Sequence, residues 1–252
     1  MKILVAFKRV IDPDARIKLK ADKSAIDTGS VEYKANPFCE NALEEAIKVA
    51  EDHDAEVVIV TIGGDDTEQQ IRAGLAMGAA RAIRVDVDDA KLDSDLAARI
   101  IAAVAKKESP DLLFFGKQAV DGDNNQVGQL VAEYLGLPQA CFASKVELKD
   151  GEAIVTREVD GGLETIAVKL PAVVTADLRL NTPRNAALPM VMKARSKPLA
   201  VRPVAEFGVD VTPRLKVEKV SPPAERPGGR TVASVSELTS AIKSELSELE
   251  AR

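Results

Sequence analysis

One stretch of the chain is rich in small polar side chains that could bind a ligand: residues 116–130, with the sequence GKQAVDGDNNQVGQL. An apolar run precedes it and a helical pattern follows it. Gly116 and Gly122 can let the backbone approach a ligand closely or adopt a positive φ. Asn124 or Asn125 can cap the following helix, whose free N–H groups and positive dipole end attract a phosphate. The stretch therefore has the groups that a phosphate-binding turn needs.

Two aspartates in the same stretch, Asp121 and Asp123, extend this chemistry. Their carboxylates would repel a phosphate, but they can accept hydrogen bonds from ribose hydroxyls. The residues together predict a nucleotide cradle. The competing interpretation is a surface loop with a well-capped helix, and the stretch alone leaves both open.

The other residues that could do chemistry form no second constellation. His53 is the only histidine and lies in EDHD, which is typical of a solvated helix end, so a serine or cysteine nucleophile lacks its usual base. Cys39 and Cys141 are the only cysteines, which excludes a disulfide framework and a CxxC metal site. The helix dipole could lower the pKa of Cys39, but a packed, inert thiol is favoured. Glu44 and Glu45 are interpreted as a solvated helix face.

The chain around the cradle alternates between predicted strands and helices. A continuous apolar run, typical of a strand buried on both faces, occurs at residues 2–7, and further strands are predicted at residues 55–64, 81–87 and 111–116. Helical spacing follows each predicted strand, at residues 38–54, 65–79, 94–109 and 124–136. The alternation predicts an α/β fold with a doubly wound, mostly parallel, Rossmann-like sheet.

The pattern changes after about residue 140. The turn sequences KDGE (149–152) and VDGG (159–162) separate alternating runs and predict an antiparallel hairpin or meander inserted into the fold. Residues 171–178 predict one more buried strand.

The C-terminal part differs in composition. Prolines accumulate from about Pro198, and a charged amphipathic helix is predicted at residues 237–252. Such a segment cannot fold around its own core, so it is either disordered or an arm laid on a partner. Five apolar residues favour the arm: Leu199, Val201, Val204, Phe207 and Val209. We expect a nucleotide-binding α/β domain at residues 1–197 and an extended arm, ending in a helix, at residues 198–252.

The predicted topology places the cradle at a ligand site. In an open parallel sheet, ligands bind beyond the carboxyl ends of the strands, where the strand order reverses. In a flavodoxin-like order, the first and fourth strands flank that reversal, and here they end at Phe7 and Gly116. We therefore expect the loops after these two strands to face one crevice.

Composition argues against several classes of function. The net charge is -6 and aromatic residues make up only 3% of the chain, so nucleic-acid binding is not expected. No apolar run approaches the roughly 18 residues of a membrane span. The N-terminal sequence MKILVAFKR has too few apolar residues for a signal peptide, and the scarcity of cysteine suits a reducing compartment.

Five motifs, in this order along the chain, resemble one known family. They are NPFCE (36–40), LAMGA (75–79), GKQAVDGDNNQVGQ (116–129), REVDGGLET (157–165) and PAVVTADLRLNTPRNAALPMVMKA (171–194). Together they resemble the beta subunit of electron transfer flavoprotein, from Met1 to about Lys197. Several motifs in a fixed order are more specific than any one of them.

The resemblance implies an electron carrier subunit rather than an enzyme, with no catalytic residues of its own. Such proteins are heterodimers that carry electrons from flavin dehydrogenases, such as the acyl-CoA dehydrogenases of fatty acid oxidation, to a quinone-linked oxidoreductase. The redox FAD is held mainly by the alpha subunit, on a mobile domain, and the C-terminal arm would pack on that subunit. The implied compartment is the cytoplasm of a bacterium or the mitochondrial matrix of a eukaryote, without direct membrane insertion.

The beta subunit of this family commonly buries an AMP with a structural role, on a fold of the adenine-nucleotide-binding type. Ile62, which stands where some members have cysteine, would touch the adenine. The resemblance implies AMP contacts at Ala6, Asn36, Pro37, Phe38, Cys39, Ile62, Gly116, Lys117, Gln118, Ala119, Val120, Asp121, Gly122, Asp123, Asn124, Asn125, Gln126 and Val127. These residues coincide with the crevice expected from the topology.

The segment NAALPMVMKAR (185–195) resembles the loop with which the family recognises partner dehydrogenases. Leu188 would insert into a hydrophobic pocket of the partner, while a short core helix is the competing interpretation. The neighbours implied in recognition are Pro189, Met190, Met192, Lys193 and Arg195. Glu158 matches an acid that pairs with an arginine of the mobile flavin domain.

Two departures from the family pattern leave alternatives open. Pro13 replaces an aromatic residue that can stack on the flavin, and Val127 replaces a threonine that can bind phosphate. DGDNNQ leans towards the electron-bifurcating branch, whose beta subunits bind a second FAD in the same crevice, whereas NPFCE favours AMP.

Two further classes share this fold, which does not itself settle function. Adenine-nucleotide hydrolases and ligases need a phosphate-handling cation or a metal site, and Lys117 is present without an obvious acidic cluster. A non-redox adenine-nucleotide-binding adaptor would exchange its nucleotide reversibly.

Overall fold

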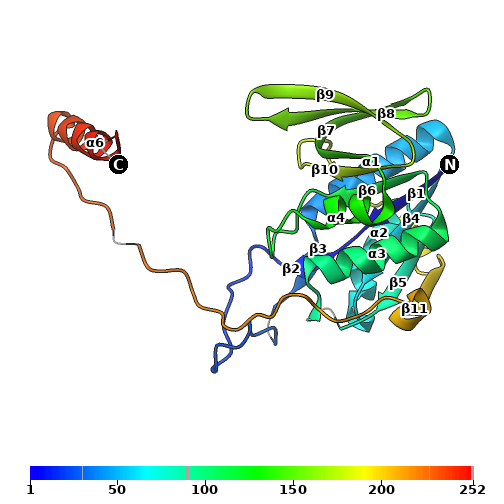
Figure 1. The fold of residues 1–252 in the computed structure, drawn as a ribbon. Coiled ribbons are helices and arrows are strands. Elements are labelled where there is room, and N and C mark those ends of the chain that lie inside the picture. The colour runs from blue at the N-terminus through cyan, green and yellow to red at the C-terminus, as the bar shows by residue number, and fades with distance from the viewer. Residues whose placement is uncertain (30, 89–90, 227, 251–252) are drawn as a thin grey trace.

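The computed structural model describes residues 1–29, 31–88, 91–226 and 228–250. Within these residues the main sheet has nine strands, in the order β11-β5-β4-β1-β6-β10-β7-β8-β9 (Figure 1). The strands are β1 (Lys2–Ala6), β4 (Glu56–Ile62), β5 (Arg81–Asp86), β6 (Leu112–Gly116), β7 (Gln139–Lys149), β8 (Glu152–Val159), β9 (Gly162–Lys169), β10 (Ala172–Ala176) and β11 (Leu199–Pro203). All neighbouring strands from β11 to β7 pair in parallel. The pairs β7–β8 and β8–β9 are antiparallel. The predicted fold class is confirmed.

Four helices cover both faces of the parallel part: α1 (Pro37–His53), α2 (Glu68–Met77), α3 (Ser94–Glu108) and α4 (Val127–Leu135). The other described helical elements are α5 (Leu188–Ala194), α6 (Val235–Glu250) and the 3-10 turns η1 (Asp65–Thr67) and η3 (Val204–Phe207). One core cluster joins α1 and α2 to side chains such as Ile59 and Phe114, and the other joins α3 and α4 to Val58 and Phe115. The alternation of these side chains follows from the twofold period of a strand.

The strand order reverses between β1 and β6, as the alternating pattern predicted. β1 pairs with β4 on one side and with β6 on the other, both in parallel. The carboxyl ends of β1 and β6 therefore lie side by side at the reversal point.

The predicted antiparallel meander is confirmed as β7, β8 and β9. At the KDGE turn, Asp150 and Gly151 both have positive φ, 53° and 80°. That backbone matches the twist of the flanking strands and closes a two-residue hairpin. In Figure 1 the β8–β9 hairpin lies at the top, at one edge of the sheet.

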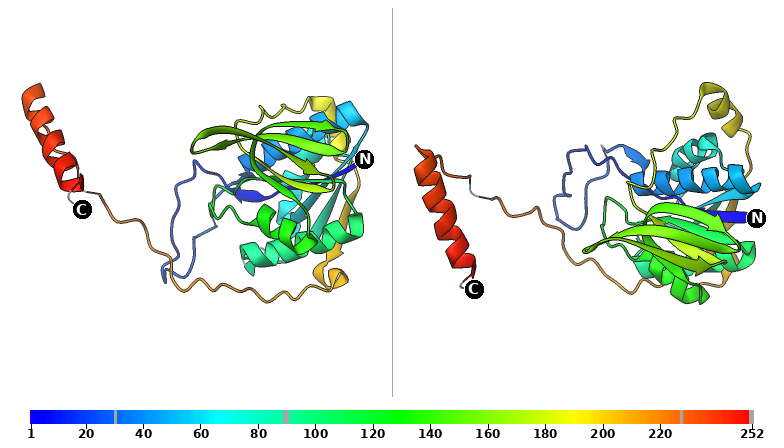
Figure 2. Two further views of the ribbon diagram at one scale, coloured as in Figure 1. Left: turned by 45° about the horizontal axis from the view of Figure 1, so that its top comes forward. Right: turned by 90° about the horizontal axis from the view of Figure 1, so that it is seen from above.

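The sheet continues beyond residue 197, where the arm was expected to begin. Leu199–Pro203 forms β11 and pairs in parallel with β5, and Val204 and Phe207 pack against the α3 side of the core. Beyond this point the chain leaves the sheet, and α6 stands apart from it in both views of Figure 2. Only the later part of the predicted arm is therefore separate from the sheet.

The long connection between β1 and α1 contains a feature that the sequence pattern did not reveal. β2 (Arg9–Ile11) and β3 (Tyr33–Ala35) pair as a small antiparallel sheet beside the main one. Pro13 lies in the loop between them. No helix within the described residues is long and apolar enough to cross a membrane.

Candidate functional site

The carboxyl ends of β1 and β6 meet the first turn of α1. Ala6 and Gly116 are the last residues of these strands, and Ile62 ends β4, the other neighbour of β1. A Cβ added at Gly116 would lie 2.7 Å from the carbonyl carbon of Phe38 and 2.8 Å from the nitrogen of Cys39. Gly116 is thus required by close packing, because a side chain here would push α1 away from the strand end.

Asn36 joins the loops that form the predicted crevice. This fully buried residue donates from Nδ2 to the carbonyl of Gln118 (2.8 Å) and accepts at Oδ1 from the N–H of Val120 (3.2 Å). Its own N–H donates to the carbonyl of Lys8 (2.9 Å). The side-chain amide fixes the loop after β6 and the backbone N–H fixes the loop after β1, so this buried residue holds the two loops together. The residues expected after β1, before α1 and after β6 are therefore brought together.

An ion pair joins the loop after β1 to the loop after β6. Lys8 Nζ lies 2.7 Å from Asp121, and the two side chains are 53% and 34% exposed. Gln118 Nε2 donates to Asp123 Oδ1 at 2.8 Å. An ion pair this exposed contributes little to stability, so a ligand can displace it at small cost. Asp121 and Asp123 retain further lone pairs for hydroxyl donors.

The predicted cap of α4 is wrong. The helix begins at Val127 with Gln126 at the N-cap, and no side chain makes a capping hydrogen bond. Asn125 instead accepts from Gln129 Nε2 at 3.0 Å, within the loop. The first N–H groups of α4 have no side-chain cap, so they are open to an anion.

The conformation of the loop after β6 also differs from the prediction. The positive φ values belong to Asp123 (48°) and Asn125 (50°), not to Gly122. Asparagine and aspartate tolerate this region better than other non-glycine residues. Gly128 contributes close packing instead: a Cβ there would lie 2.6 Å from Thr175 Cγ2 on β10. The start of α4 is therefore held against the sheet.

Cys39 is a packed thiol, as the sequence favoured. It is buried at the start of α1, and burial raises the pKa of its thiol despite a hydrogen bond from Asn36. Lys117 forms an ion pair within the chain, because its Nζ lies 3.0 Å from a carboxylate oxygen of Asp177. Burial raises the pKa of the Asp177 carboxyl, but hydrogen bonds from Lys117 and from the backbone N–H of Arg179 outweigh it and lower the pKa overall.

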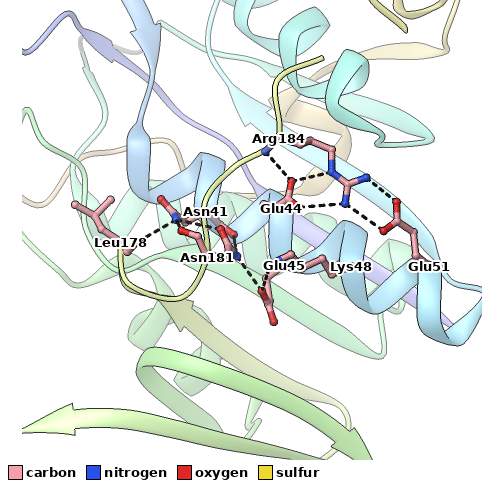
Figure 3. Close-up of polar contacts among 8 residues, drawn as sticks. All are labelled: Asn41, Glu44, Glu45, Lys48, Glu51, Leu178, Asn181 and Arg184. Carbon is pink, nitrogen blue, oxygen red and sulfur yellow. Dashed lines mark hydrogen bonds and ion pairs between the residues drawn. The ribbon is translucent and has the colours of Figure 1, made fainter. Parts of the chain in front are cut away.

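The interpretation of Glu44 and Glu45 as a solvated face is wrong. Their exposed fractions are 3% and 8%. Figure 3 shows why: the segment after β10 lies along α1, and Arg184 pairs with Glu44 while Asn181 donates to Glu45 at 2.8 Å. The helix is covered on the side opposite the sheet, a contact made by residues about 140 positions away in the chain.

The segment expected to recognise partners forms a short exposed helix, α5. Leu188 is 74% exposed and Met192 is 55% exposed, so the alternative of a core helix is wrong for this face. Val191, which the sequence did not single out, is also exposed on it. Only Ala194 of this helix is fully buried. The remaining expected residues, Pro189, Met190, Lys193 and Arg195, lie on or directly after α5.

Glu158 already has a partner within the chain. Its carboxylate lies 2.5 Å from Arg179, which also contacts Asp177 at 3.4 Å. Both Arg179 and Glu158 are partly exposed, so a cation from another chain can reach this carboxylate. The sequence pattern did not indicate the pairing.

Two comparisons relate the chain to known proteins. A family model described as "Electron transfer flavoprotein domain" matches residues 24–207. Among similar proteins, the electron transfer flavoprotein subunit beta of Bradyrhizobium diazoefficiens is 48% identical over 246 residues, covering 97% of this chain and 98% of that protein. The mitochondrial subunit beta of Arabidopsis thaliana is 48% identical over 248 residues, with 97% and 98% covered. The Homo sapiens subunit beta is 45% identical over 247 residues, with 96% and 97% covered.

Proposed function

The chain belongs to the family of electron transfer flavoprotein beta subunits, and we propose that it binds a structural AMP in the crevice at the carboxyl ends of β1 and β6. In this proposal it pairs with an alpha subunit that holds most of the FAD. The heterodimer carries electrons from flavin dehydrogenases, such as acyl-CoA dehydrogenases, to a quinone-linked oxidoreductase.

The observation that carries the AMP proposal is the bridge made by Asn36. A buried side chain holds the start of α1 and the loop after β6 together, at the point where parallel sheets bind ligands. With Asn36 in place, the backbone groups of the loop after β6 keep fixed positions beside the strand ends, as a ligand site requires. The donor set also fits: uncapped N–H groups of α4 suit a phosphate, and Asp121 and Asp123 suit ribose hydroxyls.

AMP suits this site as a structural ligand. It would contact both loops and the start of α4 while offering no phosphoanhydride bond to cleave. Lys117, the cation that a hydrolase could use, is paired with Asp177. Among the described residues, no three or more His, Cys, Asp and Glu side chains gather as a metal site. The hydrolase and ligase alternatives therefore gain no support.

FAD supplies the redox chemistry of such a heterodimer when bound. This chain's own residues would position partners around it. Leu188 and Met192 present an apolar face for a dehydrogenase, and the cations Lys193 and Arg195 beside it would orient the approach. Glu158 would accept an arginine of the flavin domain in exchange for Arg179. The chain beyond residue 209, with the exposed apolar residues of α6, would pack on the alpha subunit.

A second candidate is a bifurcating-type subunit with a second, redox-active FAD in the same crevice. Its support is the DGDNNQ motif, whose first four residues are all exposed and leave room for a larger ligand at the rim. A third is a non-redox adenine-nucleotide-binding adaptor.

The test is to co-express the chain with its alpha subunit and purify the complex. We expect a yellow heterodimer with one flavin, whose absorbance bleaches when an acyl-CoA dehydrogenase and its substrate are added. Two flavins per heterodimer would favour the bifurcating type. A colourless chain that binds no alpha subunit would favour the non-redox adaptor as its function.

A further inference from the structure

We infer that α5 is held in a docking-ready orientation by two clamps, and that Arg184 and Lys197 are positioning residues for partner docking. The first clamp joins residues 181 and 184, before α5, to α1. The second joins residues 194 and 197, at its end, to α2. The inference rests on the proposed function, because it concerns how the docking surface of α5 is presented.

The first clamp centres on Arg184 (Figure 3). Its guanidinium makes two-pronged contacts with Glu44 (2.9 and 3.1 Å) and Glu51 (2.6 and 3.1 Å), and its backbone N–H donates to Glu44 at 3.0 Å. Paired hydrogen bonds of this kind fix direction as well as distance. The two carboxylates raise the pKa of Arg184, so its charge is constant.

A pair of amides extends the first clamp along α1. Asn41 donates to the carbonyl of Asn181 at 2.7 Å, and Asn181 Nδ2 donates back to the carbonyl of Asn41 at 3.0 Å. Asn41 also donates to the carbonyl of Leu178 at 3.2 Å. The chain from the end of β10 to residue 184 is therefore fixed on α1 at several backbone positions.

The second clamp is reciprocal between α2 and α5. Arg72 of α2 donates to the carbonyls of Ala194 (3.0 Å) and Lys197 (2.8 Å), which lie at and just after the end of α5. Lys197 Nζ donates to the carbonyls of Leu75 (2.8 Å) and Ala79 (2.6 Å), at and just after the end of α2. Each side chain satisfies carbonyls that a helix end leaves without partners.

Between the clamps the segment touches the rest of the chain through α2 and a few small side chains, with Ala194 in the core cluster and Ala186 packed against it. α5 has seven residues, which is too short for a helix to be stable in water by itself. Its apolar side chains Leu188, Val191 and Met192 are exposed, and only Ala194 is fully buried. The orientation of Leu188 therefore depends on where the two ends of the segment are fixed.

Fixing a docking surface before contact lowers the cost of association. A partner that must first order a mobile segment binds more weakly, in proportion to the fraction of molecules that already have the docking geometry. Loosening either clamp should then raise the KM for the heterodimer while leaving kcat unchanged. A purely structural role would instead lower flavin content or the yield of heterodimer.

The test uses purified heterodimer as the electron acceptor of a flavin dehydrogenase. Two variants loosen the clamps: Arg184→Lys keeps the charge but loses the paired hydrogen bonds of the guanidinium, and Lys197→Met removes the bonds to α2. A third variant, Leu188→Ala, reports on docking itself. Lys145→Met is the matched control, since Lys145 forms an exposed ion pair with Glu147 on β7. Hydrogen exchange of residues 185–194 is measured on the same samples.

We expect Arg184→Lys and Lys197→Met each to raise KM about three- to tenfold with kcat within about twofold, and to speed exchange across α5. Flavin content and heterodimer yield should match the wild type and Lys145→Met. If Leu188→Ala raises KM while both clamp variants leave it unchanged, the positioning role of Arg184 and Lys197 is overturned, and α5 is retained as the proposed docking surface. If Leu188→Ala itself has no effect, the proposed docking function fails and the inference fails with it. A loss of flavin in the clamp variants, parallel to any rise in KM, also overturns the positioning role.

Discussion

Replacing Asn36 with alanine should weaken nucleotide binding, because the side chain of this residue connects the start of α1 to the loop after β6. The substitution removes the bonds to the carbonyl of Gln118 and the N–H of Val120 (2.8 and 3.2 Å), together with a weaker bond to Cys39 Sγ (3.2 Å). Asn36→Ala therefore tests the crevice more cleanly than a change in the exposed part of the loop.

The magnitude follows from the two backbone groups left without partners. Each unsatisfied, part-buried group costs about 1–3 kcal/mol, and water entering the gap recovers some of it, so we expect a loss of about 2–4 kcal/mol. For a chain of this size that corresponds to a fall in Tm of roughly 5–15 °C. If half of the loss, about 1–2 kcal/mol, falls on the ligand-bound arrangement, AMP affinity drops roughly 5- to 30-fold.

The assay is differential scanning fluorimetry of the heterodimer together with the AMP content after gel filtration. Asn185→Ala is the control, because Asn185 is exposed on the segment before α5. An Asn36→Ala heterodimer that keeps one AMP and the wild-type Tm would refute the reasoning.

Three further predictions follow from single contacts. Gly128→Ala should weaken AMP retention and destabilise the heterodimer by about 1–3 kcal/mol, measured by denaturant unfolding, because the new methyl meets Thr175 at 2.6 Å; unchanged unfolding would contradict it. Cys39 should react with iodoacetamide far more slowly than a free thiol at pH 8, by mass spectrometry, because burial raises its pKa; rapid labelling in the folded state would refute this. Asp177 has a lowered pKa in the folded chain, so its pairing with Lys117 stabilises above the ordinary carboxyl pKa of 3.8 and is lost as the pH falls below it. Asp177→Asn should therefore lower Tm at pH 7 and do so progressively less as the pH falls below 3.8, and a pH-independent effect would count against the ion pair.

The parallel sheet and the convergence of the loops after β1 and β6 could be predicted from the sequence. Buried parallel strands show as continuous apolar runs, and LLFFG at residues 112–116 is a clear example. The KDGE turn predicted the β7–β8 hairpin because aspartate and glycine tolerate the positive φ that it needs. These signals are local, so one sequence suffices to detect them.

Contacts between distant segments could not be predicted in this way. Glu44 and Glu45 have the composition of a solvated face, and only the arrival of Asn181 and Arg184 buries them. The sequence of β11, LAVRP, ends in Arg202 and Pro203 and so lacks the continuous apolar run of a buried strand, and its place beside β5 is a tertiary result.

The cap of α4 illustrates a different limit. Asn124 and Asn125 are good capping residues by type, yet the positive φ at Asp123 and Asn125 delays the helix until Val127. The consequence favours function: the helix start is left without a side-chain cap where a phosphate can bind.

The measurement that tests the central claim most directly is the nucleotide content of the purified heterodimer, released by denaturation and quantified by chromatography. The account predicts one AMP together with one FAD per heterodimer. Two FAD and no AMP, or no nucleotide beyond the FAD of the alpha subunit, would contradict it.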